Sequence, residues 1–154
     1  MRRALLLSTA VLLTACGGGG GGDEVDPKAE YVSQATAICE DAAAQRDELK
    51  SPTAAAEFAP YADGLVRIAD QAQTDLTALE PPPADREELE TKVFEPFSTV
   101  VDEGRAFAAQ VRAAGADQAK LLPLLSDLPD AGEVDLEYLR SYGLGACADL
   151  IDTA

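Results

Sequence analysis

Residues 58–79 read FAPYADGLVRIADQAQTDLTAL, in which apolar side chains recur in steps of four and three residues. Such steps return to one face of an α-helix every two turns, as they do in helical bundles. The predicted inward stripe consists of Phe58, Ala62, Leu65, Ala69, Ala72, Leu76 and Leu79. We therefore expect a helical region from Pro52 or Thr53 to Leu79, with Pro60 either in its first turn or at a kink.

A similar pattern precedes this stretch. Asp26 is a good N-cap residue and Pro27 suits the first helical position, so a helix should begin there. It should end near Lys50, because the next residues are Ser51 and Pro52. Its inward face is predicted to hold Tyr31, Ala35, Ile38, Ala42 and Leu49, with Cys39 beside that face.

The helical pattern resumes after a stiff break at Pro81–Pro83. A third long helix is expected from Ala84 onward, bent at Pro96 and capped by Gly115. Its inward residues are predicted to be Leu89, Val93, Phe97, Val100, Gly104, Phe107 and Val111. Gly104 is interpreted either as a cost to the helix or as a close crossing point.

The last quarter of the chain is less regular. Shorter helices are predicted over residues 116–128, which contain Pro123, and over residues 134–142, with a turn at 129–132 between them. No long stretch alternates with a period of two, so no sheet is expected. The sequence predicts an all-α protein: an antiparallel bundle of about four helical segments, whose fourth side is filled by the broken C-terminal segments.

The first residues have the order of a cleaved secretion signal. Arg2 and Arg3 precede an apolar run, Ala4–Ala15, that is too short to cross a bilayer core, which takes about 20 residues. Leu13-Thr14-Ala15-Cys16 ends the run and comes directly before Gly17–Gly22. This arrangement resembles the bacterial lipobox, whose cysteine sulfur is joined to diacylglycerol and becomes residue one after cleavage. The resemblance implies lipidation of Cys16, and the alternative is a free thiol.

Three parts of the chain follow from this interpretation. Residues 1–15 are expected to be a lipoprotein signal peptide, 16–26 a lipidated cysteine with a flexible Gly-rich tether, and 27–154 the helical bundle domain. The lipobox resemblance implies that the domain lies on the outward, extracytoplasmic face of the cell membrane. It would be anchored there by lipid and would not span the bilayer.

Two further cysteines remain, Cys39 and Cys147. An exported protein meets an oxidising environment, in which an even number of cysteines favours a disulfide bond. Only one pairing within the chain is then available, and it would tie the first helix to the C-terminal segment. A redox-active or metal-binding thiol pair is the alternative, but the Cys-x-x-Cys spacing of such pairs is absent.

The composition excludes several classes of function. The chain has 28 acidic and 12 basic residues and a formal net charge of −16, so nucleic acid is not an expected partner. It contains no histidine, which excludes Ser-His-Asp and Cys-His catalysis and His-ligated zinc. No combination of residues indicates an enzyme, and no motif indicates a cofactor.

An acidic segment near the C-terminus is a weak candidate for calcium. It offers Asp127, Asp130 and Asp135 as ligands, with Gly132 at the sixth position of an EF-hand loop that begins at Asp127. The loop fails at its third, fifth and twelfth positions, which hold Pro129, Ala131 and Tyr138. The interpretation that we favour is a solvated acidic turn that caps the following helix.

The four tyrosines are the other candidates for a binding site. They are Tyr31, Tyr61, Tyr138 and Tyr142. They either line a ligand groove or lie at the edge of the core with their hydroxyl groups in water.

Three segments together resemble a group of small actinobacterial secreted proteins and lipoproteins. They are Tyr31–Cys39, Leu79–Pro83 and Tyr142–Cys147. The resemblance implies a helical bundle in which the early and late cysteines pair, but it implies no activity. For function we favour a protein-interaction module that meets a partner at the cell envelope. The alternative is a binding protein for a small molecule or a cation such as calcium, and an enzyme is the hypothesis that we favour least.

Overall fold

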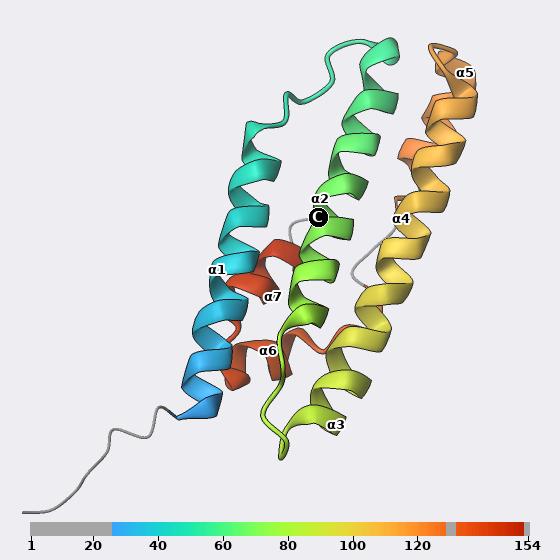
Figure 1. Ribbon diagram of the computed structural model, residues 1–154. Coiled ribbons are helices and arrows are strands. Elements are labelled where there is room, and N and C mark those ends of the chain that lie inside the picture. Colours follow the sequence, from blue (N-terminus) through green and yellow to red (C-terminus); the bar gives the residue numbers. More distant parts are fainter. Residues whose placement is uncertain (1–25, 129–131, 153–154) are drawn as a thin grey trace, which may run out of the picture.

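The computed structural model describes residues 26–128 and 132–152, and within these ranges the protein is an all-α bundle without strands. Three long helices, α1 (Pro27–Glu48), α2 (Phe58–Ala78) and α4 (Glu95–Ala114), run antiparallel in one layer, with α2 in the middle (Figure 1). Helices α6 (Leu136–Tyr142) and α7 (Gly145–Asp152) lie behind the lower half of this layer in the same view, and α5 (Gln118–Leu125) lies at its top. The predicted fold class is confirmed.

The two ends of the bundle differ. We call the end that contains Pro27, Leu79 and Asp85 proximal, because the chain enters the bundle there (Figure 1). The end that contains Leu49 and Ala114 is the distal end. Since α1 has 22 residues, the two ends are about 30 Å apart.

Helix α1 begins as the sequence predicts. The Oδ1 atom of Asp26 accepts a 2.9 Å hydrogen bond from the backbone N–H of Lys28, and Pro27 occupies the first turn. Of the predicted inward residues, Tyr31, Ala35 and Ala42 are buried, and Ile38 and Leu49 are partly buried against the core. Cys39, predicted beside this face, is buried as well, because α7 packs on that side of α1.

Helix α2 begins later than the predicted Pro52 or Thr53. A short 3-10 turn, η1 (Ala55–Glu57), precedes it, and the carboxylate of Glu57 accepts hydrogen bonds from the backbone N–H groups of Thr53 and Ala54 at 2.7 and 3.1 Å. These bonds hold the preceding residues in an extended conformation and lower the pKa of Glu57. Pro60 lies in the first turn of α2, where its missing N–H breaks no interior hydrogen bond.

The third helical region is interrupted before Pro96. It consists of α3 (Arg86–Leu89), a π-helical turn η2 (Glu90–Phe94), and α4. In a regular α-helix the N–H of residue 96 would donate to the carbonyl of Lys92, but proline has no N–H. That carbonyl accepts a 3.1 Å hydrogen bond from the backbone N–H of Asp135 instead, which joins the start of α6 to this region. The irregularity predicted at Pro96 therefore takes the form of a π turn.

The C-terminal segments include one helix that the sequence does not predict. The helix predicted over residues 134–142 corresponds to α6, and after it α7 begins at Gly145 and carries Cys147. Gly143 closes α6 with a φ of +107°, a conformation that favours glycine, whereas Gly145 opens the next helix. The two glycines thus separate two helices that pack against each other.

The buried core is divided along the length of the bundle. The proximal core surrounds Cys39, Leu89 and Leu139, and includes residues from α6 and α7. The distal core is made by α2, α4 and α5 around Val111 and Leu121. A third and smaller cluster of buried residues, Ala42, Ile68 and Ala72, joins α1 to α2, and Leu150 of α7 packs against it.

Candidate functional site

The predicted lipid site, Cys16, lies outside the described residues, as do the predicted signal peptide and all of the predicted tether except Asp26. No helix in the described part of the chain is both long enough and apolar enough to cross a membrane.

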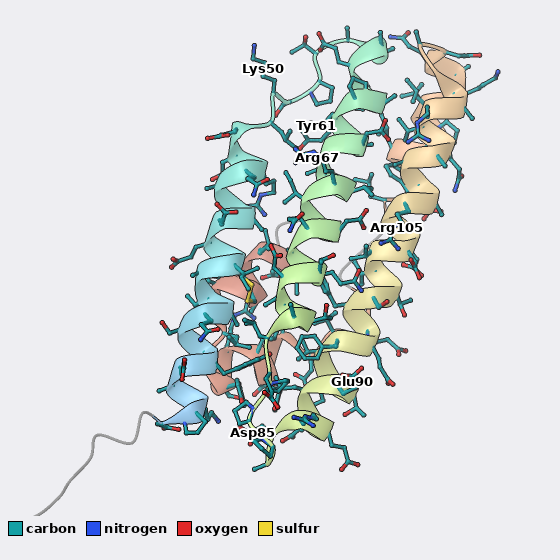
Figure 2. All side chains as sticks on the ribbon, in the orientation of Figure 1. Lys50, Tyr61, Arg67, Asp85, Glu90 and Arg105 are labelled. Carbon is teal, nitrogen blue, oxygen red and sulfur yellow. A yellow bond between two sulfur atoms is a disulfide. The ribbon has the colours of Figure 1, made fainter. Side chains whose placement is uncertain are left out.

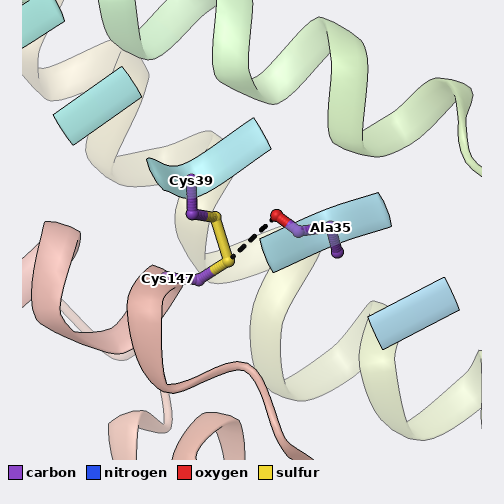
Figure 3. The surroundings of a disulfide bond; sticks show 3 residues. All are labelled: Ala35, Cys39 and Cys147. Atoms are coloured by element: carbon purple, nitrogen blue, oxygen red, sulfur yellow. Dashed lines mark hydrogen bonds between the residues drawn. A yellow bond between two sulfur atoms is a disulfide. The ribbon is translucent and has the colours of Figure 1, made fainter. Parts of the chain in front are cut away.

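Cys39 and Cys147 are joined by a disulfide bond with a Cα–Cα distance of 5.0 Å. The bond links α1 to α7 across a sequence separation of 108 (Figure 3). The Sγ atom of Cys147 also contacts the carbonyl oxygen of Ala35 at 3.7 Å. Both cysteines are buried, with exposed fractions of 1 % and 4 %. This burial favours a structural bond, because redox-active cysteines are usually accessible to a partner thiol.

The acidic segment divides into separate roles. Asp127 is exposed after α5, and Asp130 lies outside the described residues. Asp135 caps α6, because its Oδ1 atom accepts a 2.8 Å hydrogen bond from the backbone N–H of Tyr138. Within residues 26–128 and 132–152, no group of three or more Asp, Glu, Cys or His side chains is arranged to hold a metal ion.

Three of the four tyrosines come together at the proximal end. The rings of Tyr138 and Tyr142 stack with their centroids 5.6 Å apart, and Tyr31 meets Tyr142 edge-on at 6.3 Å. The fourth, Tyr61, lies on the distal half of α2, far from Asp85 (Figure 2), to which Tyr142 is hydrogen-bonded. We call Tyr31, Tyr138 and Tyr142 the tyrosine cluster.

Charged groups surround the tyrosine cluster. The hydroxyl of Tyr142 donates a 2.7 Å hydrogen bond to Oδ2 of Asp85, which also faces Lys28 at 3.9 Å. The Lys28 ammonium lies 3.9 Å from the centre of the Tyr142 ring, and the Lys92 ammonium lies 4.5 Å from the centre of the Tyr138 ring. These are cation–π contacts, which stabilise the packing of α6 against α1 and the α3–η2 region.

The hydroxyl groups of the cluster stay protonated at physiological pH. Burial raises the pKa of Tyr31 to about 12, and burial together with the bond to Asp85 raises the pKa of Tyr142. The Tyr31 and Tyr138 hydroxyls are buried and have no hydrogen-bond partner among the described residues. None of these tyrosines can therefore act as a general base near neutral pH. The role that their contacts support is to join helices.

An apolar cavity of about 160 Å³ lies between the two cores. Helices α1, α2, α4 and α7 all contribute to its wall, which consists of Ala42, Arg46, Leu65, Val66, Ile68, Ala69, Ala72, Phe97, Val100, Val101, Gly104, Leu150 and Ile151. Three of the predicted stripe residues of α2 therefore line a hollow. The hollow exists because small residues from three helices meet there: Ala42, Ala69, Ala72 and Gly104.

Arg46 is the single charged residue among those that line the cavity. Its side chain is 23 % exposed, and its Nη1 donates to the carbonyl oxygen of Leu150 at 3.3 Å. Its Nη2 lies 3.5 Å from Oδ1 of Asp47, whose side chain is 74 % exposed. The guanidinium thus bridges α1 and the end of α7 beside the apolar wall.

The sequence indicates this arrangement only in part. A small residue on an inward face is compatible with close packing as well as with a hollow, so Ala69 and Gly104 do not by themselves predict a cavity.

Comparison with protein-family models, with curated proteins and with solved structures finds no match to this chain. The site must therefore be interpreted from its own geometry.

Proposed function

We propose that the protein is a lipid-anchored, extracytoplasmic binding protein whose helical domain holds a small apolar ligand between α1, α2, α4 and α7. The observation that carries the proposal is the cavity of about 160 Å³ with its aliphatic and aromatic wall. Ligand sites in proteins are mostly apolar hollows with a few polar groups that orient the ligand. An apolar cavity of roughly this size, about 150 Å³, stays dry and binds molecules as small as benzene.

The proposed location rests on the lipobox-like sequence. Diacylglycerol on Cys16 would hold the protein at the outward face of the cell membrane, and the glycine tract would separate the domain from the surface. The net charge of −16 supports a tethered domain over a docked one, because anionic head groups repel it. Binding, as distinct from catalysis, suits tyrosines that stay protonated and an apolar cavity wall.

Probe binding with a cavity-filling variant tests this function. Benzene or a similar small aromatic probe should raise the melting temperature of the wild-type domain, because a ligand that binds only the folded state stabilises it. Ala69→Leu would fill part of the cavity and should abolish the shift. Ala106→Leu adds the same side chain to the exposed face of α4 and should preserve it. Equal shifts in the two variants would contradict the proposal.

A second candidate function, a protein-interaction module at the envelope, is favoured by the distal end. Leu122 and Leu128 are 65 % and 60 % exposed, and they lie on and just after α5, the helix at the distal end of the bundle (Figure 1). Exposed apolar side chains at the end away from a membrane tether suit contact with an envelope protein.

Cross-linking in intact envelopes tests the second candidate. Wild-type protein should capture one partner in near-stoichiometric amounts, whereas Leu122→Ser combined with Leu128→Ser should lose it. A Cys16→Ala form shows whether capture depends on the proposed anchor. The interaction hypothesis fails if the leucine variant captures the same proteins in the same amounts.

A further inference from the structure

We infer that the cavity binds an uncharged, unbranched alkyl chain, which enters it lengthwise and extends toward the disulfide bond past the side chain of Ile151. This inference rests on the proposed binding function and specifies its ligand. The observation that carries it is a second apolar void, of about 20 Å³, which is lined by both disulfide cysteines and continues the cavity along the bundle. A molecule that matches such a hollow is narrow, flexible and apolar along its length.

The two voids follow each other along the helices. On α2 the cavity is lined from Leu65 to Ala72, and the second void is lined by Ala72 and Leu76. On α4 the lining of the cavity passes from Gly104 to Phe97, and Phe97 lines the second void as well. Both series advance toward the proximal end, so the voids lie end to end. From Leu65 to Leu76 the distance along the axis of α2 is about 16 Å.

A common wall of four side chains separates the voids: Ala72, Phe97, Leu150 and Ile151. Ala72 carries only a methyl group, so it cannot close the passage. Ile151 belongs to the last turn of α7, and the ends of helices open at low cost. Ile151 is therefore the side chain that limits how far a ligand enters. A linear chain can use the narrow extension behind it, whereas a branched or wide ligand cannot.

The lining of the cavity favours a neutral ligand. Its wall contains no carboxylate among the described residues, and its one guanidinium is held within the protein, where Arg46 donates to the carbonyl oxygen of Leu150 and faces Asp47. A charge that is buried without a partner costs free energy, and the net charge of −16 repels anions in addition. An uncharged chain avoids both costs.

The first experiment compares two isomeric alcohols, 1-hexanol and 3,3-dimethyl-1-butanol, by calorimetry on the whole protein. Leu65 and Val100 are only partly buried, so the hydroxyl group of either probe can stay in water at the mouth of the cavity. The linear isomer should bind about tenfold more tightly, because a branched chain overfills a narrow hollow. Hexanoate should bind about tenfold more weakly than 1-hexanol. Equal binding of the isomers would contradict the linear shape, and tighter binding of hexanoate would contradict the neutral ligand.

The second experiment measures the depth of the hollow with a series of linear alcohols. Binding should tighten by about fourfold for each added methylene until the cavity is full, and longer chains should then gain little. Ile151→Ala should raise this limiting length by at least one methylene, because it joins the two voids. Ile68→Ala is the matched control, since Ile68 lines the cavity but not the second void. It should widen the hollow, improve binding of the branched isomer and leave the limiting length unchanged.

A milder pair of variants covers the case in which the alanine proteins do not fold. Ile151→Val should strengthen binding of the first alcohol beyond the limiting length, and Ile68→Val should not. If the variants at both positions change the limiting length equally, or if neither changes it, the role assigned to Ile151 is wrong.

Benzene separates this inference from the proposed function. If benzene raises the melting temperature of wild-type protein but not of Ala69→Leu, while the isomeric alcohols bind equally, the cavity is a binding site without preference for a linear chain. The inference then fails and the proposed function stands. If neither benzene nor any of the alcohols binds, both fail. The response of the Ile151→Ala protein to benzene shows in the same way whether its cavity is intact.

Discussion

The hydroxyl of Tyr142 on α6 lies 2.7 Å from Oδ2 of Asp85, which comes 57 residues earlier in the sequence. This hydrogen bond connects the C-terminal part of the chain to the loop that joins α2 and α3. A neutral donor bonded to a carboxylate in a partly buried position stabilises a fold by about 1.5–3 kcal/mol.

Tyr142→Phe should therefore destabilise the protein by about 1.5–3 kcal/mol. The ring would still stack on Tyr138 and still meet Lys28, so the change isolates the hydroxyl. Urea denaturation of the two proteins measures the difference. Tyr61→Phe, on the distal half of α2, is the control and should change the free energy of unfolding by less than about 0.5 kcal/mol. Equal losses in the two variants would argue against the special role of the Asp85 contact.

Tyr31→Phe should have the opposite effect at neutral pH. The Tyr31 hydroxyl is buried without a hydrogen-bond partner among the described residues, so its removal leaves no orphaned group and should be neutral or stabilising.

The Tyr31 hydroxyl should also make the stability of the folded protein fall at alkaline pH. Burial raises the pKa of Tyr31 from 10.0 to about 12, so the folded state keeps a proton that the unfolded chain releases. Stability is then complete below about pH 10 and falls as the pH rises toward 12.

Denaturation midpoints at pH 8, 9, 10 and 11 measure this dependence. The fall should be shallower in Tyr31→Phe, because that variant has lost one of the groups whose pKa is raised. Tyr142 and Tyr138 contribute in the same direction, so a residual slope should remain. A wild-type midpoint that is constant from pH 8 to 11 would contradict this explanation.

The disulfide bond should act as one unit. Cys39→Ala and Cys147→Ala should each lower the free energy of unfolding by about 4–5 kcal/mol according to the chain-entropy model for a loop of this length. The double variant should cost little more than either single one, because the first substitution already breaks the bond. Calorimetric unfolding of the three proteins checks this. Additive losses would show that the two sulfurs contribute independently.

The sequence predicts the long helices well because their signals are local. The Asp26 cap, the first-turn Pro60 and the stripe on α2 depend on residues within a few turns of each other. The cysteine pairing was also accessible, since only one pair remained after Cys16 was assigned to lipid. These features required no knowledge of how the helices pack.

The parts that the sequence did not predict depend on packing between distant segments. Cys39, predicted only beside the inward face, is buried because α7 lies against it, and α7 is not predicted because Gly143 and Gly145 serve two different helices. The tyrosine cluster joins α1 to α6. The cavity forms where small side chains from several helices meet, so no single residue predicts it.

Gly104→Ala should stabilise the protein by up to about 1 kcal/mol. Glycine inside a helix costs about that much relative to alanine, and a Cβ atom at position 104 would meet Val66 Cγ2 at 3.9 Å, an ordinary van der Waals contact. Gly64→Ala is the informative comparison on α2, because its Cβ would come within 3.0 Å of Leu49 Cδ2. Thermal denaturation should rank the proteins as Gly104→Ala above wild type and above Gly64→Ala. If Gly104→Ala is less stable than wild type, the added Cβ atom does not fit beside Val66 and the prediction is wrong.

Lipidation of Cys16 should decide where the protein resides. In the producing cell, wild-type protein should partition into the detergent phase of a membrane extract, and intact mass should show loss of residues 1–15 and gain of a diacylglycerol-containing group. Cys16→Ala should leave the protein without the lipid mass and with residues 1–15 still attached, and only a fragment that also lacks the apolar run should partition into the aqueous phase, because it has neither membrane attachment. The folded domain should be unaffected, so the melting temperature of an aqueous fragment that starts at Asp23 should equal that of the released lipoprotein. A wild-type protein that is recovered in the aqueous phase with an unmodified Cys16 would remove the anchor from the proposed function, while the cavity and its ligand tests would stand independently.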